Sequence, residues 1–342
     1  MKSLKEADIK KGMKVLVRCD FNCPIDDNGN ITEDYRINAA LPTIKYLIEK
    51  EAKIILMSHL GEPGGQVIER LRLDEIRDKL SENINSHFLK APDCIGEEVK
   101  KMINEMAPGK ILLLENLRFH KGENENDEMF AKEISSLGDI FINDAFGTCH
   151  RKHASIVSLP KFLPSFAGFL VEMEVDIMSR ILKDPKRPLV SVFGGAKIET
   201  KIPAIKKFLR VADRVLIGGK IAIEAKFSDS KIYLPEDFDE DKLDIGPKTI
   251  KKFKEIISKA KTIVWNGPMG YFEKERFETG TREIAEAIAK SSAFKVIGGG
   301  QTSFAVSKYG LMDKIDFNST GGGAMLDFLA YGTLPGLEVL NY

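Results

Sequence analysis

Short apolar runs recur along the chain, and longer segments with a helical spacing lie between them. In the first half four runs end in polar side chains: VLVRCDFN (15–22), IILMSHLG (54–61), ILLLENLR (111–118) and IFINDAFG (140–147). The segments 36–50 and 126–137 carry apolar residues three and four positions apart, which is the period of one helix face. Buried strands that alternate with helices predict an α/β fold with a parallel, doubly wound sheet.

The second half repeats this plan, but its strands end in glycines. The runs are LVSVFGGAK (189–197), RVLIGGK (214–220), TIVWNGPMG (262–270) and FKVIGGG (294–300). In open parallel sheets, ligands bind at the carboxyl ends of the strands. The strand ends carry polar side chains in the first half and bare backbone in the second. This contrast predicts two domains that each bind one ligand.

Two further segments predict a connector and a tail. Residues 163–184 combine turn residues with a strong helical period, so we expect a connecting helix that packs on a domain. Residues 332–342 are too short to form a unit of their own. We expect them to dock elsewhere on the protein, and the first domain is one candidate.

Composition limits the possible partners. The chain has 342 residues, of which 43% are apolar and 30% charged, and this length suffices for two globular domains. Lysine plus arginine and aspartate plus glutamate both total 51. This balance gives no indication of a nucleic acid, a membrane surface or another polyanion as partner, so any basic site must be local.

The chain start and the cysteines favour a reduced, cytoplasmic location. Residues 1–14 are charged throughout and lack the apolar core of a signal peptide, and no apolar run elsewhere approaches membrane-spanning length. Cys19 and Cys23 are not spaced as a CxxC pair, and Cys94 and Cys149 stand alone. We therefore expect free thiols and no structural zinc.

Two lysines follow the glycines of the first run in the second half. Lys197 and Lys201, in GGAKIETK, are four residues apart and share one face of the helix that begins there. A helix N-terminus favours negative groups, so a bound anion such as phosphate would explain two lysines at this place. A solvated lysine pair on a surface helix is the alternative.

Three more glycine-rich stretches extend this predicted nucleotide site. IGGGQTSFAV (297–306) presents bare N–H groups at a helix start, which suits phosphate, but it contains neither a lysine nor a carboxylate. WNGPMGYFE (265–273) contributes Glu273, which is free to accept hydrogen bonds from a ribose, although a plain turn also explains the stretch. STGGGAM (319–325) is either a phosphate site or a hinge.

Polar side chains gather at the strand ends of the first half. They are Asp20, Asn22, Ser58, His59, Asn116, Arg118, Asn143 and Asp144, with Arg36, His150 and Arg151 in the loops beyond. Guanidinium groups match phosphate and carboxylate bidentately, so this set predicts a site for a small phosphorylated or carboxylated molecule. A surface ion pair is the better explanation for any single arginine, but not for the whole set.

Motifs argue against three other enzyme classes. Neither GGAKIE nor GGGQTS has the GxGxxG spacing of a nicotinamide-dependent dehydrogenase. The GxxxxGK[ST] motif of P-loop nucleotidases is missing from the sequence, and so is a GxSxG nucleophile elbow.

Together these residues resemble the phosphoglycerate kinase family. Ten sequence motifs occur in the family's order, from near the start of the chain to residue 336. They are DFNCPI, DYRI, LPTIKYL, MSHLG, LLLENLRF, NDAFGTCHR, GGAK, WNGPMGYFE, STGGGA and LPG. The resemblance implies two Rossmann-like domains with parallel, doubly wound sheets that face a cleft and are joined by a hinge helix. The phosphoglycerate-binding domain would comprise 1–160 and 325–342, and the nucleotide-binding domain 161–324.

The reaction implied by the resemblance is reversible phosphoryl transfer from 1,3-bisphosphoglycerate to ADP, which gives 3-phosphoglycerate and ATP with Mg²⁺ as cofactor. In the ATP-consuming direction the attacking group is a carboxylate that is already deprotonated at neutral pH, so no general base is needed. Catalysis then consists of positioning and charge stabilisation. We also expect domain closure that excludes water, and a monomer.

The resemblance assigns both sites residue by residue. The implied phosphoglycerate site consists of Asp20, Asn22, Arg36, Ser58, His59, Gly61, Arg118, His150 and Arg151. The implied nucleotide site consists of Gly194, Gly195, Ala196, Lys197, Lys201, Gly219, Asn266, Gly267, Glu273, Gly299, Gly300 and Thr302. Lys197 and Arg36 would neutralise the phosphoryl group in flight, and Lys201 would bind the nucleotide phosphates.

Several positions depart from the family pattern. Gln301 stands where the family has the aspartate that binds the metal, and Thr200 stands for a second aspartate, with Glu199 beside it. Magnesium prefers carboxylate oxygen, so these changes weaken the expected metal site, which leaves Gln301, Glu199 or the nucleotide phosphates to hold the ion.

Two further departures concern the ligands themselves. Glu62 in HLGEP replaces an arginine that faces the substrate phosphate, and we expect the loop to turn this carboxylate away from the site. Lys220 replaces a methionine, and the stretch from there to LDIGP is much shorter than in the family. Nucleotide choice is therefore open.

Two other functions are compatible with the sequence. The first is a phosphoglycerate kinase homologue that keeps the fold and serves as a ligand-binding or regulatory protein without turnover. The second is an unrelated two-domain protein that binds sugar phosphates. Retention of Arg36, Lys197 and Lys201 favours an active kinase.

Overall fold

The chain forms two compact units. The computed structural model describes residues 1–26, 28–85 and 88–342, and the contacts within it separate unit 1 (Met1–Val175 with Thr333–Tyr342) from unit 2 (Asp176–Gly332). The boundary falls within helix α6 (Phe169–Lys183), in the segment for which the sequence predicts a connecting helix. Residues 161–175 lie in unit 1 and 325–332 in unit 2, whereas the sequence-based domains divide these two stretches the other way.

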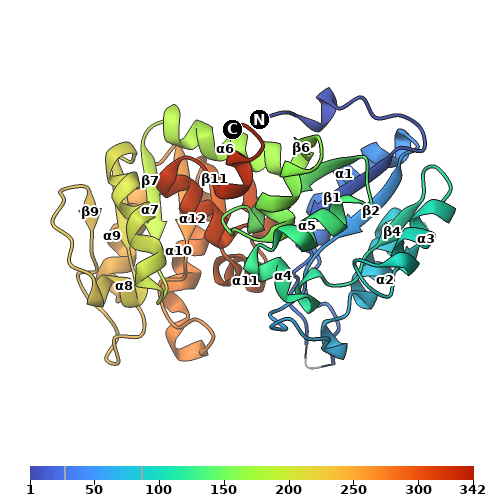
Figure 1. Cartoon of the computed structure of the whole chain (residues 1–342). Helices are drawn as coiled ribbons and strands as arrows, with labels where there is room; N and C mark the ends of the chain where they lie inside the picture. Colours follow the sequence, from blue (N-terminus) through green and yellow to red (C-terminus); the bar gives the residue numbers. More distant parts are fainter. Residues whose placement is uncertain (27, 86–87) are drawn as a thin grey trace. The chain divides into compact units, whose positions relative to one another are not determined.

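Unit 1 is built on a parallel sheet. Its strands are β1 (Lys14–Cys19), β2 (Lys53–Met57), β3 (Leu89–Lys90), β4 (Ile111–Leu113), β5 (Ile140–Asp144) and β6 (Ser165–Ala167). They pair in the order β3-β4-β2-β1-β5-β6, and every pairing is parallel. Figure 1 labels β1, β2, β4 and β6 of this sheet. The order reverses direction at β1, which is the kind of position where open α/β sheets bind ligands.

Helices cover both faces of this sheet, which explains why its central strands are apolar throughout. Val15 and Val17 of β1 point to a core shared with α1 (Tyr35–Glu49) and α2 (Asp74–Ile84). Leu16 points to the opposite core, which includes residues of α3 (Glu97–Glu105) and α5 (Glu128–Ser135). Alternate residues of one strand therefore serve two cores.

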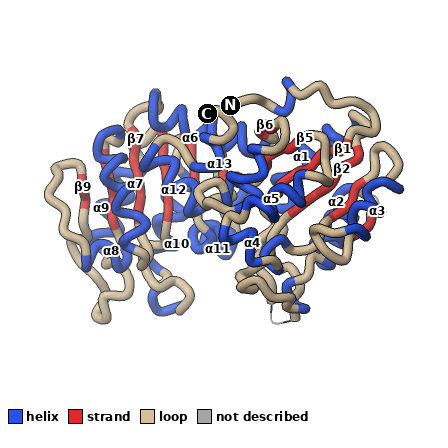
Figure 2. Tube along the Cα trace, in the orientation of Figure 1, coloured by secondary structure: helices blue, strands red, loops and turns tan. Residues whose placement is uncertain are grey.

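Unit 2 has a second parallel sheet. Its strands are β7 (Leu189–Phe193), β8 (Arg214–Ile217), β9 (Ile232–Tyr233), β10 (Thr262–Asn266), β11 (Phe294–Gly298) and β12 (Phe317–Ser319). Their order is β12-β11-β10-β7-β8-β9, again with parallel pairings. Figure 2 labels β7 and β9 of this sheet and shows helices around them. Two such sheets confirm the predicted α/β class.

The helices of unit 2 also form two layers. One face of the sheet packs against α9 (Pro247–Ile257), α10 (Thr279–Lys290) and α11 (Gly300–Lys308), and the fully buried Trp265 belongs to this core. On the other face, the ring of Phe193 lies 5.5 Å from that of Phe208 on α7 (Ile198–Val211). Helix α12 (Gly322–Tyr331) packs beside α7.

The C-terminal segment belongs to unit 1. Helix α13 (Pro335–Glu338) is held there by the N–H of Gly336, which donates to Cys149 O at 2.8 Å. The amino group of Met1 donates to Asn341 O at 2.8 Å, so the two ends of the chain meet within this unit (Figure 1). The four cysteines are free thiols, and all of them are buried.

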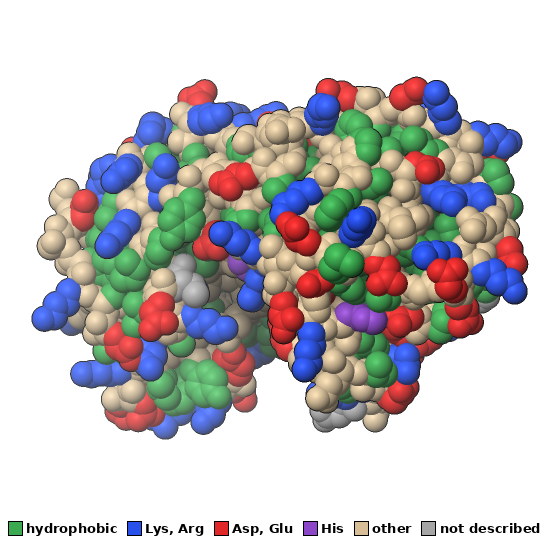
Figure 3. Space-filling view, viewed as in Figure 1, with side chains coloured by type: hydrophobic (Ala, Val, Ile, Leu, Met, Phe, Trp, Pro, Cys, Tyr) green, Lys and Arg blue, Asp and Glu red, His purple; other side chains and the backbone are tan. Residues whose placement is uncertain are grey.

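None of the helices in the described part of the chain is long and apolar enough to cross a membrane. On the face shown in Figure 3, lysine and arginine side chains alternate with aspartate and glutamate over both units, which agrees with the balanced composition.

Candidate functional site

The polar strand ends of unit 1 are tied together by hydrogen bonds. Asn22, in the loop after β1, accepts from Gly61 N with its Oδ1 at 2.8 Å. Ser58, after β2, accepts from Phe21 N at 2.9 Å. Asp20 accepts from Asn22 N at 3.2 Å. The loops after β1 and β2 thus form one rigid surface at the carboxyl edge of the sheet.

Arg36 reaches this surface from the first turn of α1. Its Nη1 donates to Asn22 O at 2.7 Å and lies 3.6 Å from Asp20 Oδ1. The side chain is 28% exposed, so part of the guanidinium faces solvent while a buried carboxylate orients it. An arginine held in this way keeps N–H groups available for an anion.

His59 is buried beside a second arginine. Arg18 Nη2 lies 3.1 Å from His59 Nδ1, and both side chains are almost fully buried. Burial, and after it the charges of Arg18, Arg118 and Arg36, lowers the pKa of His59 well below its usual range. His59 is therefore neutral at physiological pH and accepts the Arg18 hydrogen bond through Nδ1, so its proton resides on Nε2.

Arg118 sits in the short helix η3 (Leu117–Phe119) that follows β4. Burial lowers its pKa, and the neighbouring Glu62 carboxylate opposes that effect. Its Nη1 donates to Gly61 O at 2.9 Å and to Glu62 Oε1 at 2.7 Å. We expected the loop to turn Glu62 away from the site, but its carboxylate contacts one of the predicted site residues.

The remaining cations of the predicted set lie near the same centre. Arg151 and His150 act on His153, a buried neighbour that the sequence did not single out: burial, and then the charges of Arg118, Arg18, Arg151 and His150, lower the pKa of His153 to about 3. Arg151 is exposed, and His150 is half-buried. The arginines and histidines predicted from separate loops therefore act on common neighbours, as expected of one cationic site.

Sequence reasoning did not identify the buried support of this site. Arg18 Nε donates to Ser155 Oγ at 2.8 Å, and Ser155 Oγ donates to Glu123 Oε1 at 2.6 Å. Arg18 and Glu123 are fully buried and 3.7 Å apart. The signal was present, because an arginine inside the apolar run VLVRC must find a buried partner.

Three of the polar strand-end residues serve the fold. Asn116 Nδ2 donates hydrogen bonds to Leu60 O at 2.8 Å and to Leu71 O at 2.9 Å. Asn143 Oδ1 accepts from Ala145 N at 3.1 Å. Asp144 is fully buried and accepts from Leu170 N at 2.9 Å in the first turn of α6. Asn143 and Asp144 thus shape the turn after β5 and the start of α6.

The glycine ends of unit 2 pack backbone against backbone. Gly195 N donates to Pro268 O at 2.7 Å, and Gly219 N donates to Met269 O at 2.9 Å. A Cβ on Gly219 would lie 2.6 Å from Gly195 N, and Gly219 has φ +60°. Only glycine permits this approach of the β7, β8 and β10 ends, and the resulting surface exposes backbone at the carboxyl edge.

Lys201 and Lys197 occupy different environments in α7. Lys201 is buried, and its Nζ donates to Gly194 O and to Asn266 O. Burial, and then the charge of Lys197, lowers the pKa of Lys201 to about 8. Lys197 is the N-cap residue of α7 and is exposed. The predicted pair therefore consists of one buried and one accessible ammonium group at a helix start.

Helix α11 supplies the rest of the predicted nucleotide surface. Gly299 caps it with φ +98°, and Thr302 Oγ1 accepts from Gly267 N at 2.7 Å. Asn266 Nδ2 donates to Gly298 O at 2.7 Å. Gly322, in the STGGGA stretch, packs closely on Gly299: a Cβ added to Gly322 would lie 2.6 Å from the Cα of Gly299. That stretch therefore buttresses the start of α11.

Comparison with known proteins decides the family. The phosphoglycerate kinase family model matches residues 4–231 and 225–331. Phosphoglycerate kinases of Aquifex aeolicus and Dictyoglomus turgidum are each 44% identical to this chain, and the alignments cover 99% of it and 98% of each relative. This chain belongs to the phosphoglycerate kinase family.

Solved phosphoglycerate kinase structures agree with this assignment. The enzyme from Pyrococcus horikoshii superposes on this chain with a TM-score of 0.87 at 34% identity. The match covers 100% of this chain and 98% of the Pyrococcus horikoshii chain. The enzyme from Coxiella burnetii gives a TM-score of 0.82 at 34% identity, and the match covers 99% of this chain and 98% of the Coxiella burnetii chain.

The comparison also locates the shortened region. The alignment with the Aquifex aeolicus phosphoglycerate kinase spans 391 positions, although this chain has 342 residues, so the relative contains a stretch that is missing here. The two matched parts of the family model meet at 225–231, between α8 (Gly219–Glu224) and β9. This chain therefore crosses from β8 to its parallel neighbour β9 through residues 218–231, which contain one short helix.

The described residues fit a dedicated magnesium site poorly. Gln301 Nε2 donates to Glu273 Oε1 at 3.1 Å, so the side-chain amide at the predicted metal position is hydrogen-bonded to a neighbouring carboxylate. Glu199 is exposed, and the side chain of Thr200 lies outside the described residues. Mg²⁺ takes an octahedron of oxygen ligands and often relies on phosphates and water. These residues favour magnesium that arrives with the nucleotide.

A second group of possible metal ligands lies in unit 1, apart from the predicted metal positions. Asp93, Cys94 and His120 place their ligand atoms within 4.8 Å of one another. Asp93 Oδ1 and His120 Nε2 already form an ion pair at 2.7 Å. Burial raises the pKa of the Cys94 thiol well above its usual value, which disfavours the thiolate that a metal requires. The ion pair accounts for this group.

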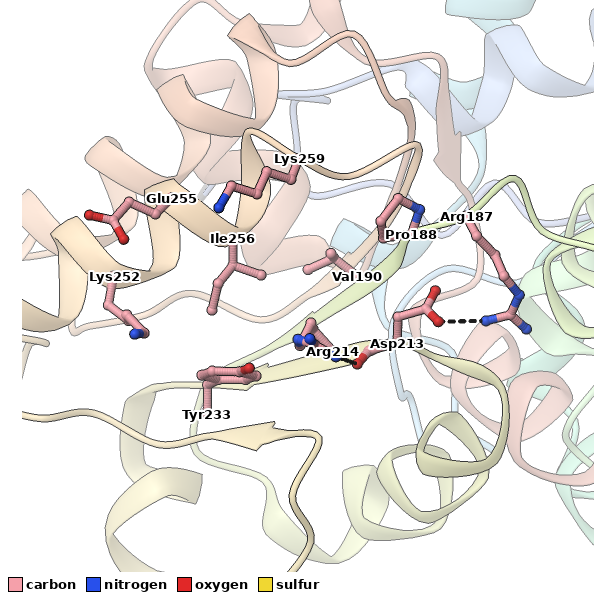
Figure 4. A pocket seen from close by; sticks show the side chains of 10 residues that line it. All are labelled: Arg187, Pro188, Val190, Asp213, Arg214, Tyr233, Lys252, Glu255, Ile256 and Lys259. Atoms are coloured by element: carbon pink, nitrogen blue, oxygen red, sulfur yellow. Dashed lines mark hydrogen bonds and ion pairs between the residues drawn. The ribbon is translucent and has the colours of Figure 1, made fainter.

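The hollow in Figure 4 lies at the opposite edge of the unit 2 sheet. It has a volume of about 640 Å³, and Arg187, Pro188, Asp213 and Arg214, at the amino ends of β7 and β8, line it together with Tyr233 and residues of α9. Arg187 and Asp213 are paired at 2.9 Å. It contains none of the predicted nucleotide-site residues, which gather at the carboxyl ends.

Proposed function

We propose that this chain catalyses the reversible transfer of a phosphoryl group between 1,3-bisphosphoglycerate and ADP, with 3-phosphoglycerate and ATP as the other pair of ligands. The observation that carries the proposal is that both units, in one chain, match the same family of phosphotransferases over nearly its full length. The cationic strand ends of unit 1 and the glycine-rich strand ends of unit 2 support it.

In unit 1, Arg36 and Arg118 bind the anionic groups of the phosphoglycerate, with the exposed Arg151 beside them. Neutral His59 offers its Nε2 proton as a hydrogen-bond donor, because Arg18 occupies Nδ1. Asp20 and Asn22 orient Arg36. The attacking carboxylate is ionised at neutral pH, so these residues need only to position it and balance its charge.

In unit 2, the backbone N–H groups at the starts of α7 and α11 bind the nucleotide phosphates, with Lys201 beneath them. Such helix starts carry a partial positive charge and free N–H groups. Lys197 is accessible at the N-cap of α7, and we assign it to the migrating phosphoryl group together with Arg36. Magnesium enters with the nucleotide as part of the substrate.

Direct transfer requires the two bound ligands to meet, so the proposal includes a closed state in which both units contribute charge to the phosphoryl group. Closure removes water from the reacting centre and protects the acyl phosphate from hydrolysis. We further propose that the protein works as a monomer in the cytoplasm, in the glycolytic and gluconeogenic direction alike.

A steady-state assay tests this function. Purified protein is incubated with ATP, 3-phosphoglycerate and magnesium, and formation of the acyl phosphate is followed through its reductive dephosphorylation by a coupling enzyme. Turnover that saturates with both substrates supports the proposal. A background rate, while calorimetry still detects binding of both ligands, identifies a binding or regulatory homologue instead.

A further inference from the structure

Glu62 and Arg118 form an unusual pair at the proposed substrate site. The Arg118 side chain is only 3% exposed, and its Nη1 donates to Glu62 Oε1 at 2.7 Å. Its Nε is buried and has no hydrogen-bond partner among the described residues. Burying an N–H group unpaired is costly, and the Arg118 guanidinium makes fewer hydrogen bonds than it has N–H groups to offer.

The backbone on both sides of Glu62 is fixed. Gly61 N donates to Asn22 Oδ1, and Gly65 N donates to Arg118 O at 3.2 Å. Pro63 is buried, whereas the Glu62 side chain is 68% exposed. The carboxylate can therefore leave Arg118 by rotation of its own side-chain bonds, without movement of the loop.

The surroundings of Arg118 favour an anion at this position. After burial, which is the largest effect, Glu62 and the more distant Glu123 raise the pKa of Arg118, while Arg18 and Arg151 lower it. In the absence of substrate, Glu62 is the nearest negative group at the solvent side, because Arg118 is hydrogen-bonded to it directly. Its charge offsets part of the repulsion among these guanidinium groups.

We propose that Glu62 is an internal competitor of the anionic substrate: its carboxylate occupies Arg118 in the free protein and is displaced when an anionic group of the phosphoglycerate binds. This inference rests on the proposed function. Displacement costs the free energy of the ion pair, so Glu62 lowers the affinity for the phosphoglycerate. The nucleotide binds in unit 2 and is unaffected.

The test compares wild type with Glu62→Gln, which removes the charge and keeps the size. We expect the KM for 3-phosphoglycerate to fall by up to about fivefold, the range that partly exposed ion pairs support, with the KM for ATP unchanged. Glu128→Gln is the matched control, because Glu128 is 64% exposed and pairs with Lys161 at 2.5 Å in the same unit. It is expected to leave both constants unchanged.

An unchanged or higher KM for 3-phosphoglycerate in Glu62→Gln would overturn the inference. Titration with sulfate, followed by calorimetry, separates this outcome from failure of the proposed function. If wild type shows no turnover, the function fails; the competitor role still predicts that Glu62→Gln binds sulfate more tightly than wild type and Glu128→Gln do. Equal sulfate affinities in all three proteins would refute it.

Discussion

Gln301 donates a hydrogen bond from Nε2 to Glu273 Oε1 at 3.1 Å, which joins two residues to which the family resemblance gives separate tasks. The resemblance places Gln301 at the metal and Glu273 at the ribose. In this chain the amide holds the carboxylate in place at the start of α11. The residue that the resemblance assigns to the metal therefore makes a neutral contact here, and we propose that magnesium is held mainly by the nucleotide.

The first prediction concerns this replacement. Gln301→Asp restores a carboxylate at the position, so the magnesium concentration for half-maximal rate is expected to fall several-fold at constant ATP. The measurement is the initial rate as a function of free magnesium. Gln301→Asn is the control, since it shortens the side chain without adding charge. An unchanged magnesium curve in the aspartate variant would place the metal elsewhere.

Lys197 is expected to matter for turnover far more than for binding. Its ammonium group is accessible at the N-cap of α7, and in the proposal it contacts the migrating group. Lys197→Ala is expected to lower kcat by about 10²-fold or more, with a much smaller change in the nucleotide dissociation constant. Lys206→Ala, on the exposed side of α7, serves as the control. Equal losses in turnover and binding would contradict the assigned role.

The depressed pKa of Lys201, about 8, predicts a pH profile. Below this pH the ammonium group is charged and attracts nucleotide phosphate; above it the free enzyme loses that charge. The value of kcat/KM for ATP is thus expected to decline as the pH rises through about 8. Lys201→Arg stays charged and is expected to lack this decline. A wild-type profile that is flat up to about pH 10, near the ordinary lysine pKa, would be inconsistent with the burial argument.

Asp144 predicts a pH-dependent stability. Burial raises its pKa to about 7, against an ordinary value of 3.8, so the folded protein binds this proton more tightly than the unfolded chain does. Its contribution is greatest below the unfolded pKa and is lost as the pH rises towards 7, by a few kcal/mol. Asp144→Asn still offers Oδ1 to Leu170 N and does not ionise.

Denaturant unfolding of both proteins at pH 5 and pH 8 measures this effect. The stability of wild type relative to Asp144→Asn is expected to fall between the two pH values. The other titrating groups change the free energy of unfolding of both proteins alike, so their effect cancels when one value is subtracted from the other. A difference that stays constant over this range would show that the Asp144 carboxyl has an ordinary pKa in the folded state.

The sequence predicts the interior of both sheets and misses their edges. All eight apolar runs form strands, because a strand covered on both faces is apolar throughout. The unpredicted strands β3, β6, β9 and β12 are the outermost ones in the two sheets and are two or three residues long. Such short edge strands have no hydrophobic pattern of their own, and their neighbours determine where they pair.

The candidate sites show the same limit. Residue types at strand ends indicate which charges gather, since the ends of parallel strands meet at one edge. Residue types do not reveal with which partner each side chain forms a hydrogen bond or ion pair. The contact between Glu62 and Arg118, and the burial of Lys201 under two carbonyl groups, depend on loop geometry that periodicity does not encode.

The most direct test of the account follows the phosphoryl group itself. The protein is mixed with ATP labelled in its γ-phosphate, 3-phosphoglycerate and magnesium, and the products are separated. We predict that label appears in 1,3-bisphosphoglycerate, with ADP as the other product, and that Lys197→Ala, with nucleotide still bound, transfers the label far more slowly. Label that remains on ATP or appears only as free phosphate, with both ligands bound to a folded protein, would contradict the account.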